Sequence, residues 1–348
     1  MARTAGALAS NGKIEMLVRA SDAVQAPEPP LALSQTGAFK NLANLTPNDG
    51  CIPYDLNVPF WSDAALKSRW MCIPNNGNHN TDAEKIGFSE EGVWSYPEGS
   101  VLIKHFELLT NTSNPSSAIK LETRFVVRSE DGWYGVTYRW NNAGTDAFLL
   151  TEGQDQTYTI NSPTGNFQQT WRYPSRSECL TCHTDVAGGA LGPNTRQLNG
   201  DAFYPLTGRT ENQLETLNSL GIFNPAIPQN QLNSFLGSVL TSSPTEDESL
   251  SLAARARSYL DSNCSYCHHP TGVRANFDAR LTTPLASQNL INGNLVESLG
   301  ISNEAVIRPG SLTSSILFHR LASAGESFSM PPIAKSLVDD AGVDVLSR

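Results

Sequence analysis

Residues 119–140 read IKLETRFVVRSEDGWYGVTYRW, two apolar runs separated by a short polar stretch. The runs are rich in aromatic and β-branched residues and alternate with polar ones, which is typical of strands that bury one face. Between them, "SEDG" is a turn sequence, because Asp-Gly favours the positive φ that tight hairpins need. The stretch therefore predicts a β-hairpin at the centre of a β-sheet.

Strand-like sequence continues on both sides of this hairpin. "SVLIKHFELL" at 100–109 alternates in the same way, and Trp94, Trp133 and Trp140 add large apolar area. Polar residues at every second position imply that one face of the sheet is solvated. We expect a β-sheet or β-sandwich domain over residues 36–160.

The flanking segments have different patterns. Residues 1–35 combine a short strand pattern with a Pro- and Ala-rich stretch, as expected for a linker or the tail of a preceding domain. Residues 161–245 are rich in Pro, Asn, Gly and Ser, and form a loop-rich segment with one predicted helix that begins near Thr210. Residues 246–348 are expected to form a compact helical domain, whose first helix begins among acidic residues. The predicted fold class is α+β: a β-sheet or sandwich, a loop-rich segment, and a C-terminal α-helical domain.

Composition limits the possible functions. The chain has 348 residues and 39% hydrophobic content, enough for two or three domains. A net charge of −10 argues against nucleic acid as a partner. No apolar run is long enough to span a membrane, and the start lacks the apolar core of a signal peptide. We expect either a cytosolic chain or a piece of an exported protein.

Six cysteines are present, and two of them lie outside any motif. Cys51 and Cys72 are 21 positions apart, which suggests a disulfide and an oxidising compartment. The alternative is a pair of buried thiols.

The other four cysteines form two C-x-x-C-H motifs, "CLTCH" at 179–183 and "CSYCH" at 264–268. Two thiols at this spacing can add to the two vinyl groups of one haem, and the adjacent His then ligates the iron. The motifs therefore predict two covalently bound haem c groups. The attachment residues would be Cys179, Cys182, Cys264 and Cys267, and the iron ligands His183 and His268.

Two other chemistries use similar motifs. A single zinc site would need both pairs, but 81 residues separate Cys182 from Cys264, against roughly 15–20 in zinc ribbons. A redox-active disulfide of the thioredoxin type needs a βαβ setting, which neither motif has. Zinc also gives no reason for a His after each pair. Haem attachment is the favoured interpretation.

The second iron has a candidate for its opposite face. Met330 is followed by two prolines, and such a rigid loop can present a thioether to iron. Core packing is the alternative role for this side chain. His269 is expected at the surface or on the propionate side of the haem, and His319 is expected to be structural.

The opposite face of the first iron is less well defined. His105 shares a strand face with Val101 and Ile103, and an apolar strand face beside the motif makes it our candidate ligand. A hydrogen-bonded core histidine is the alternative role for His105. Met71, His79 and an open or water-bound iron are the alternatives for the ligand position.

The region around the second motif resembles class I cytochrome c, with a helix before the motif, a Met-Pro loop and a closing helix. A longer run, most of residues 36–335, resembles a bacterial family of secreted two-haem c-type cytochromes found with sugar-dehydrogenase-type propellers or carbohydrate-binding modules. The resemblance is carried by "LTPNDGCIPYDLNVPFWSDAALKSRW", "YRWNNAGTDA", "YPSRSECLTCHT" and "ARSYLDSNCSYCHHP". It implies a periplasmic or extracellular location and electron transfer with a redox protein. Candidate partners are a copper polysaccharide monooxygenase and a fused or adjacent sugar dehydrogenase, near polysaccharide.

Electron transfer is the function that we expect. A diheme peroxidase is one alternative, because two irons with unequal ligands fit that chemistry. A carbohydrate-binding module carrying haems is another. Its sugar platform would be the aromatic residues Trp61, Trp70, Trp94, Trp133 and Trp140, for which ordinary core packing is the simpler role.

Overall fold

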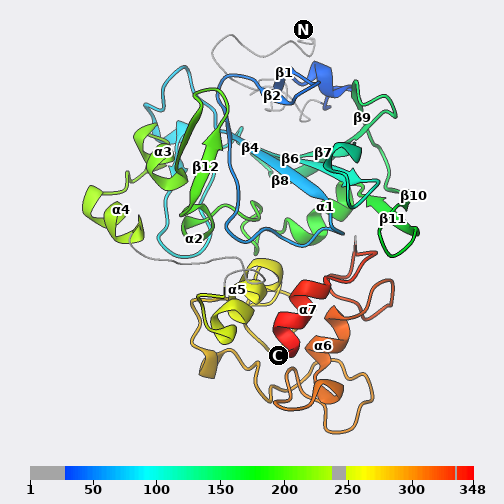
Figure 1. Cartoon of the computed structure of the whole chain (residues 1–348). Helices are drawn as coiled ribbons and strands as arrows, with labels where there is room; N and C mark the ends of the chain where they lie inside the picture. Colours follow the sequence, from blue (N-terminus) through cyan, green and yellow to red (C-terminus); the bar gives the residue numbers. More distant parts are fainter. Residues whose placement is uncertain (1–27, 237–247, 334) are drawn as a thin grey trace. The chain divides into compact units, whose positions relative to one another are not determined.

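The computed structural model describes residues 28–236, 248–333 and 335–348 (Figure 1). The strand and linker expected within residues 1–27 lie outside the described residues. The chain divides into two compact units. The described part of the first unit is 28–56, 65–168 and 172–236, and that of the second is 57–64, 169–171, 248–333 and 335–348.

A six-stranded antiparallel sheet forms the centre of the first unit, in the order β3-β4-β6-β7-β8-β9. Figure 1 labels β4, β6, β7, β8 and β9 of this sheet. Its strands are β3 (Cys51–Pro53), β4 (Leu66–Cys72), β6 (Val101–Leu109), β7 (Ala118–Ser129), β8 (Gly132–Trp140) and β9 (Ala147–Leu149). The predicted hairpin is confirmed as β7 and β8, which pair from Glu122↔Arg139 to Ser129↔Gly132.

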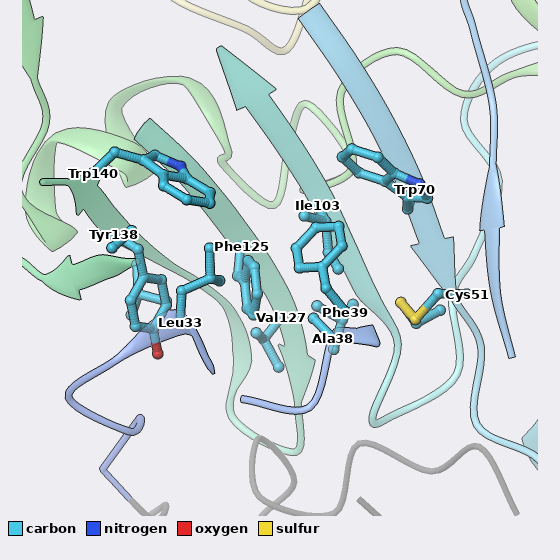
Figure 2. Close-up of a cluster of buried hydrophobic side chains, with 14 residues drawn as sticks. Leu33, Ala38, Phe39, Cys51, Trp70, Ile103, Phe125, Val127, Tyr138 and Trp140 are labelled. Carbon is cyan, nitrogen blue, oxygen red and sulfur yellow. A yellow bond between two sulfur atoms is a disulfide. The ribbon is translucent and has the colours of Figure 1, made fainter. Parts of the chain in front are cut away.

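One face of this sheet carries the hydrophobic core shown in Figure 2. Ile103, Phe125 and Val136 lie directly opposite one another on β6, β7 and β8, so their side chains point the same way. All three are buried, and Trp70 of β4 continues the row with its ring 5.0 Å from that of Phe39. Each such side chain contributes about 1.5–3 kcal/mol on burial.

The predicted disulfide is confirmed. Cys51 and Cys72 are directly paired residues of β3 and β4, with Cα atoms 4.2 Å apart, and their sulfur atoms are bonded (Figure 2). The bond ties the short strand β3 to the sheet.

Shorter elements complete the first unit. They are β1 (Phe39–Asn41), β2 (Thr46–Pro47), β5 (Ile86–Gly87), β10 (Gln154–Ile160), β11 (Phe167–Tyr173), α1 (Arg176–Cys182), α2 (Thr195–Leu198), β12 (Asp201–Tyr204), β13 (Arg209–Asn212), α3 (Gln213–Ser219), β14 (Phe223–Asn224) and α4 (Gln229–Leu236), β11 contributing residues to both units. Helix α3 is N-capped by Asn212, whose side chain accepts from the Leu214 and Glu215 amides. The predicted helix is confirmed, but the expected cap Thr210 is wrong, because Thr210 pairs with Phe203 in a β-hairpin.

The second unit corrects the predicted fold class. The expected compact α-helical domain over residues 246–348, resembling class I cytochrome c, is wrong. Described residues there form only α5 (Leu252–Cys264), α6 (Ile316–Leu321) and α7 (Asp340–Ser347), of 13, 6 and 8 residues. The short 3₁₀ turns Leu285–Ser287 and Leu312–Ser314 are the other helical pieces there.

Sequence chemistry accounts for this difference. Residues 270–311 contain several Pro, Gly and Asn residues, which interrupt helices and favour turns. Helix α5 also begins later than predicted, at Leu252, because Ser251 caps it by accepting from the Ala254 amide. Among the described residues 27% are in strands and 22% in helices, so this part of the chain is mainly β rather than α+β with a helical domain. Within the described residues, no helix is both long and apolar enough to cross a bilayer.

Candidate functional site

Both C-x-x-C-H motifs adopt the same turn. The His183 amide donates to the Cys179 carbonyl at 3.0 Å, and the His268 amide donates to the Cys264 carbonyl at 2.8 Å. Each motif lies at a helix C-terminus, since α1 ends at Cys182 and α5 ends at Cys264. Residues three apart in a helical turn share a side, so both thiols of each motif face the same way. None of these four cysteines is in a disulfide.

Helix α1 of the first motif packs directly on β8, and a glycine permits this. A Cβ atom at Gly135 would lie 2.6 Å from the Cβ and 2.8 Å from the Sγ of Cys179. Such distances are not tolerated, so only glycine allows α1 to lie this close to the strand. The packing positions Cys179, which is buried.

The imidazole of His183 is held in one tautomer. Its Nδ1 lies 2.6 Å from the Gly189 carbonyl oxygen, which can only accept, so Nδ1 carries the proton. Burial lowers the pKa of His183 to about 4, although the Gly189 bond acts in the opposite sense. The ring is therefore neutral at neutral pH, with the Nε2 lone pair available to a metal.

Strand register shows which residues share the face under α1. Gly135, Val126, Leu102 and Met71 are directly paired across β8, β7, β6 and β4, so all four lie on the face of the sheet against which α1 packs at β8. In the neighbouring row of the same face, three basic side chains follow one another: Arg69, Lys104 and Arg124.

His105 lies on the opposite face. It is three residues from Leu102, and an odd separation along a strand reverses the side-chain direction. The buried ring contacts the core residue Trp140 at 5.6 Å between centroids, and its Nδ1 lies 2.8 Å from Thr123 Oγ1. The structure therefore does not bring His105 and His183 together, because the sheet lies between them.

The two other candidates for the first iron lie in different settings. Met71 is fully buried on the face that α1 covers. His79 lies outside the six-stranded sheet, with its Nδ1 hydrogen-bonded to the Glu84 carbonyl. Of the two side chains, Met71 shares a surface with the first motif.

At the second motif, His268 stacks on Phe277, with 4.4 Å between ring centroids and 12° between planes. Its Nδ1 is buried and has no hydrogen-bond partner among the described residues. Burial lowers the pKa of His268 to about 4, and the nearby Arg320 charge acts in the same direction. Burial also raises the pKa of Cys264 to about 12, so the site holds a neutral imidazole and a protonated thiol.

The loop that carries Met330 lies beside this motif. The Met330 amide donates to the Arg320 carbonyl at 3.0 Å, and Arg320 is a charged neighbour of His268. Lys335 donates to the Met330 and Leu321 carbonyls at 2.8 and 2.7 Å, and its charge acts on Cys264. The structure thus gathers the Met330 loop, His268 and Cys264 in one neighbourhood.

Sequence reasoning missed Asp63, which belongs to the second unit. Its buried carboxylate accepts from the Ser336 and Leu337 amides at 2.9–3.0 Å and from the Ser336 hydroxyl. The contact fixes the chain just after Met330, and no local pattern signals a partner 273 residues away. The row of cations was missed too, although alternation within each strand could have indicated it.

The remaining candidates are two histidines and the tryptophans of the proposed sugar platform. His319 Nε2 lies 3.0 Å from the Thr313 carbonyl oxygen, as expected of a structural residue, and His269 Nδ1 lies 3.2 Å from Thr271 Oγ1 at a partly exposed position. Trp70, Trp94 and Trp140 are buried, so three of the five proposed platform residues are core residues.

Within the described ranges, no three His, Cys, Asp or Glu side chains are grouped to hold a metal ion. A haem iron needs only one His and one further ligand from the chain. At both motifs, unbridged thiols beside a neutral imidazole fit a covalently attached haem.

Comparison with protein-family models, with curated proteins and with solved structures found no match for this chain. The residues of the two motifs are therefore the basis for assigning a function.

Proposed function

We propose that this chain is a di-haem c-type cytochrome that transfers electrons in the periplasm or outside the cell. The observation that carries the proposal is the shared turn of the two C-x-x-C-H motifs, each with unbridged thiols on one side and a neutral imidazole after them. A bound haem would supply one-electron exchange at its iron.

The chain's own residues supply attachment and positioning. Cys179 and Cys182 would hold one haem through thioethers, and Cys264 and Cys267 the other. The hydrogen bond from His183 to Gly189 orients the ring and makes its Nε2 a better ligand, as a backbone carbonyl does for other metal-bound histidines. At the second motif, Phe277 restrains His268 by stacking.

Met330 would be the sixth ligand at the second motif. The Met330 amide donates to the Arg320 carbonyl, and the Lys335 ammonium group donates to the Met330 carbonyl. These contacts hold the loop, so little conformational freedom remains to be lost when Met330 binds iron. A thioether ligand raises the reduction potential of a haem, which favours this site as the final electron acceptor within the chain.

A redox protein is the partner that fits this function. The net charge of −10 would steer a basic partner into a transient complex. The Cys51–Cys72 disulfide agrees with an oxidising compartment. The resemblance noted in the sequence adds a copper polysaccharide monooxygenase or a sugar dehydrogenase as candidates.

The test is to express the whole chain in a host that matures c-type cytochromes and to count haems by pyridine haemochrome. We expect about two haems per chain. The double variants Cys179→Ala/Cys182→Ala and Cys264→Ala/Cys267→Ala should each lose one haem. As a matched control, Cys51→Ala/Cys72→Ala should keep both. A colourless protein with the mass of the bare polypeptide would refute the proposal, and rapid reaction with peroxide would favour the peroxidase alternative.

A further inference from the structure

Three basic side chains cross the central sheet on the face against which α1 packs. Burial, together with the nearby charges of Arg69 and Arg124, lowers the pKa of Lys104 well below its usual range. Arg69 of β4 is paired with Lys104 of β6, and Lys104 is paired with Arg124 of β7. Neighbouring strands are about 4.8 Å apart, so the three side chains leave the sheet as adjacent members of one row. Like charges at such spacing repel strongly away from water, so the row is unfavourable unless anions lie against it.

The carboxylates beside this row do not accept from every donor of the two guanidinium groups. Asp55 accepts from Arg69 Nη1 at 2.7 Å, but Arg69 is 4% exposed and its Nη2 makes no hydrogen bond in the described chain. Glu122 pairs with Arg124, whose Nε is also buried and without a hydrogen bond there. Both guanidinium groups therefore retain a buried donor for a further acceptor.

An aromatic ring orients two of the cations. Lys104 Nζ and the Arg124 guanidinium lie 4.8 and 4.5 Å from the centroid of the Phe106 ring. This fixes both groups above β6 and β7, where cation–π attraction holds them. A fixed, forked donor is the geometry that recognises a carboxylate.

The row begins at the first C-x-x-C-H motif. Arg124 is a charged neighbour of both Cys179 and Cys182, and Lys104 is a charged neighbour of Cys182 and His183. Arg69 continues the row away from the motif. A haem carries its vinyl groups on one half of the ring and its two propionate carboxylates on the other, so the half that the cysteines do not hold is anionic.

We infer that Arg69, Lys104 and Arg124 receive the propionate carboxylates of the haem attached at Cys179 and Cys182. This inference rests on the proposed function. The three cations act as positioning residues: they neutralise the carboxylates, and the carboxylates in turn relieve the repulsion along the row.

The test uses the full chain, matured with haem, and the variants Arg69→Gln, Lys104→Gln and Arg124→Gln. Arg209→Gln is the matched control, since Arg209 is an exposed cation in β13 of the same unit. Haem content should stay at the wild-type level, because the thioethers are elsewhere. The potential of one haem should fall, because loss of a nearby cation favours oxidised iron. Resonance Raman bands of propionate bending should shift for that haem, and the control should change neither quantity.

The charge-preserving variants Arg69→Lys and Arg124→Lys are controls for misfolding. They should retain the potential but shift the propionate bands, since Lys keeps the charge and loses the forked donor. The inference is overturned if haem is attached while potential and bands match the control in every variant. It is also overturned if Lys104→Gln alone changes the iron spin state, which would identify Lys104 as an iron ligand. A wild-type chain without haem defeats the proposed function and this inference together.

Discussion

Single side chains decide which atoms are available to each candidate iron. At the first motif the Gly189 carbonyl selects the His183 tautomer, and at the second Phe277 restrains His268 while its Nδ1 has no partner among the described residues. Both rings are neutral because burial lowers their pKa to about 4. The two imidazoles are thus held in different ways, and both leave a ring nitrogen for the proposed iron.

Met330→Leu tests the proposed sixth ligand of the second haem. Leucine has a similar volume but no sulfur, and the contacts that hold this loop are made by backbone carbonyls and the Met330 amide. We expect both haems to be retained, one potential to fall, and the sulfur-to-iron charge-transfer band to disappear from the absorption spectrum. Met71→Leu is the comparison variant, and an unchanged spectrum in Met330→Leu would remove Met330 from the ligand set.

His105→Gln tests the consequence of strand alternation. Because His105 faces the core, away from α1, we expect the absorption spectra of both haems to be unchanged. Loss of the Thr123 contact should lower the free energy of unfolding by about 1 kcal/mol, measured by urea denaturation. A high-spin signal from one haem would instead restore His105 as a ligand.

At the scale of elements, the close packing of α1 on β8 is what positions the first motif. This packing requires glycine at position 135, because any side chain there would displace Cys179 or bend the strand. Motif spacing alone does not determine which strand the helix approaches.

Gly135→Ala is therefore expected to be costly. Its new methyl group would overlap the Cys179 side chain, and overpacking of this kind costs about 1–3 kcal/mol. We expect lower thermal stability and less haem at the first motif, measured by unfolding and pyridine haemochrome. Haem at the second motif serves as the internal control, and full occupancy of both sites with wild-type stability would show that α1 can shift.

At the scale of the whole molecule, distant segments complete each compact unit. Residues 57–64 belong to the second unit, although the sequence around them belongs to the first. Trp61 reinforces this assignment, since its amide donates to Asn263 Oδ1 at 2.8 Å and its indole donates to the Leu337 carbonyl at 3.3 Å. Segment 57–64 thus holds both the end of α5 and the chain after Met330.

Asp63→Ala should weaken the second unit selectively. It removes a buried acceptor and leaves the Ser336 and Leu337 amides unpaired, which we expect to cost about 2–4 kcal/mol. Calorimetry should show earlier unfolding of that unit, together with a weaker charge-transfer band from the Met330 site. Asp49→Ala, at an exposed carboxylate of the first unit, is the control. Equal stability of the two variants would show that the Asp63 contacts are dispensable.

Local patterns in the sequence were sufficient for several features. The β7–β8 hairpin follows from alternation around a turn, and the disulfide follows from two leftover cysteines. The spacing of Cys179, Cys182 and His183 likewise identifies the proposed attachment site without any tertiary contact. Each depends on residues close together in the chain, so no tertiary contact is needed to read it.

Only the tertiary structure decided which face of the sheet α1 covers, and so separated His105 from His183 and placed Arg69, Lys104 and Arg124 beside the first motif. It also showed that residues 265–315 form turns and two 3₁₀ turns rather than longer helices. Alternation along a strand divides side chains into two sets, but it does not say which set a distant helix will cover. That choice depends on long-range packing, such as the absence of a side chain at Gly135, which no local pattern records.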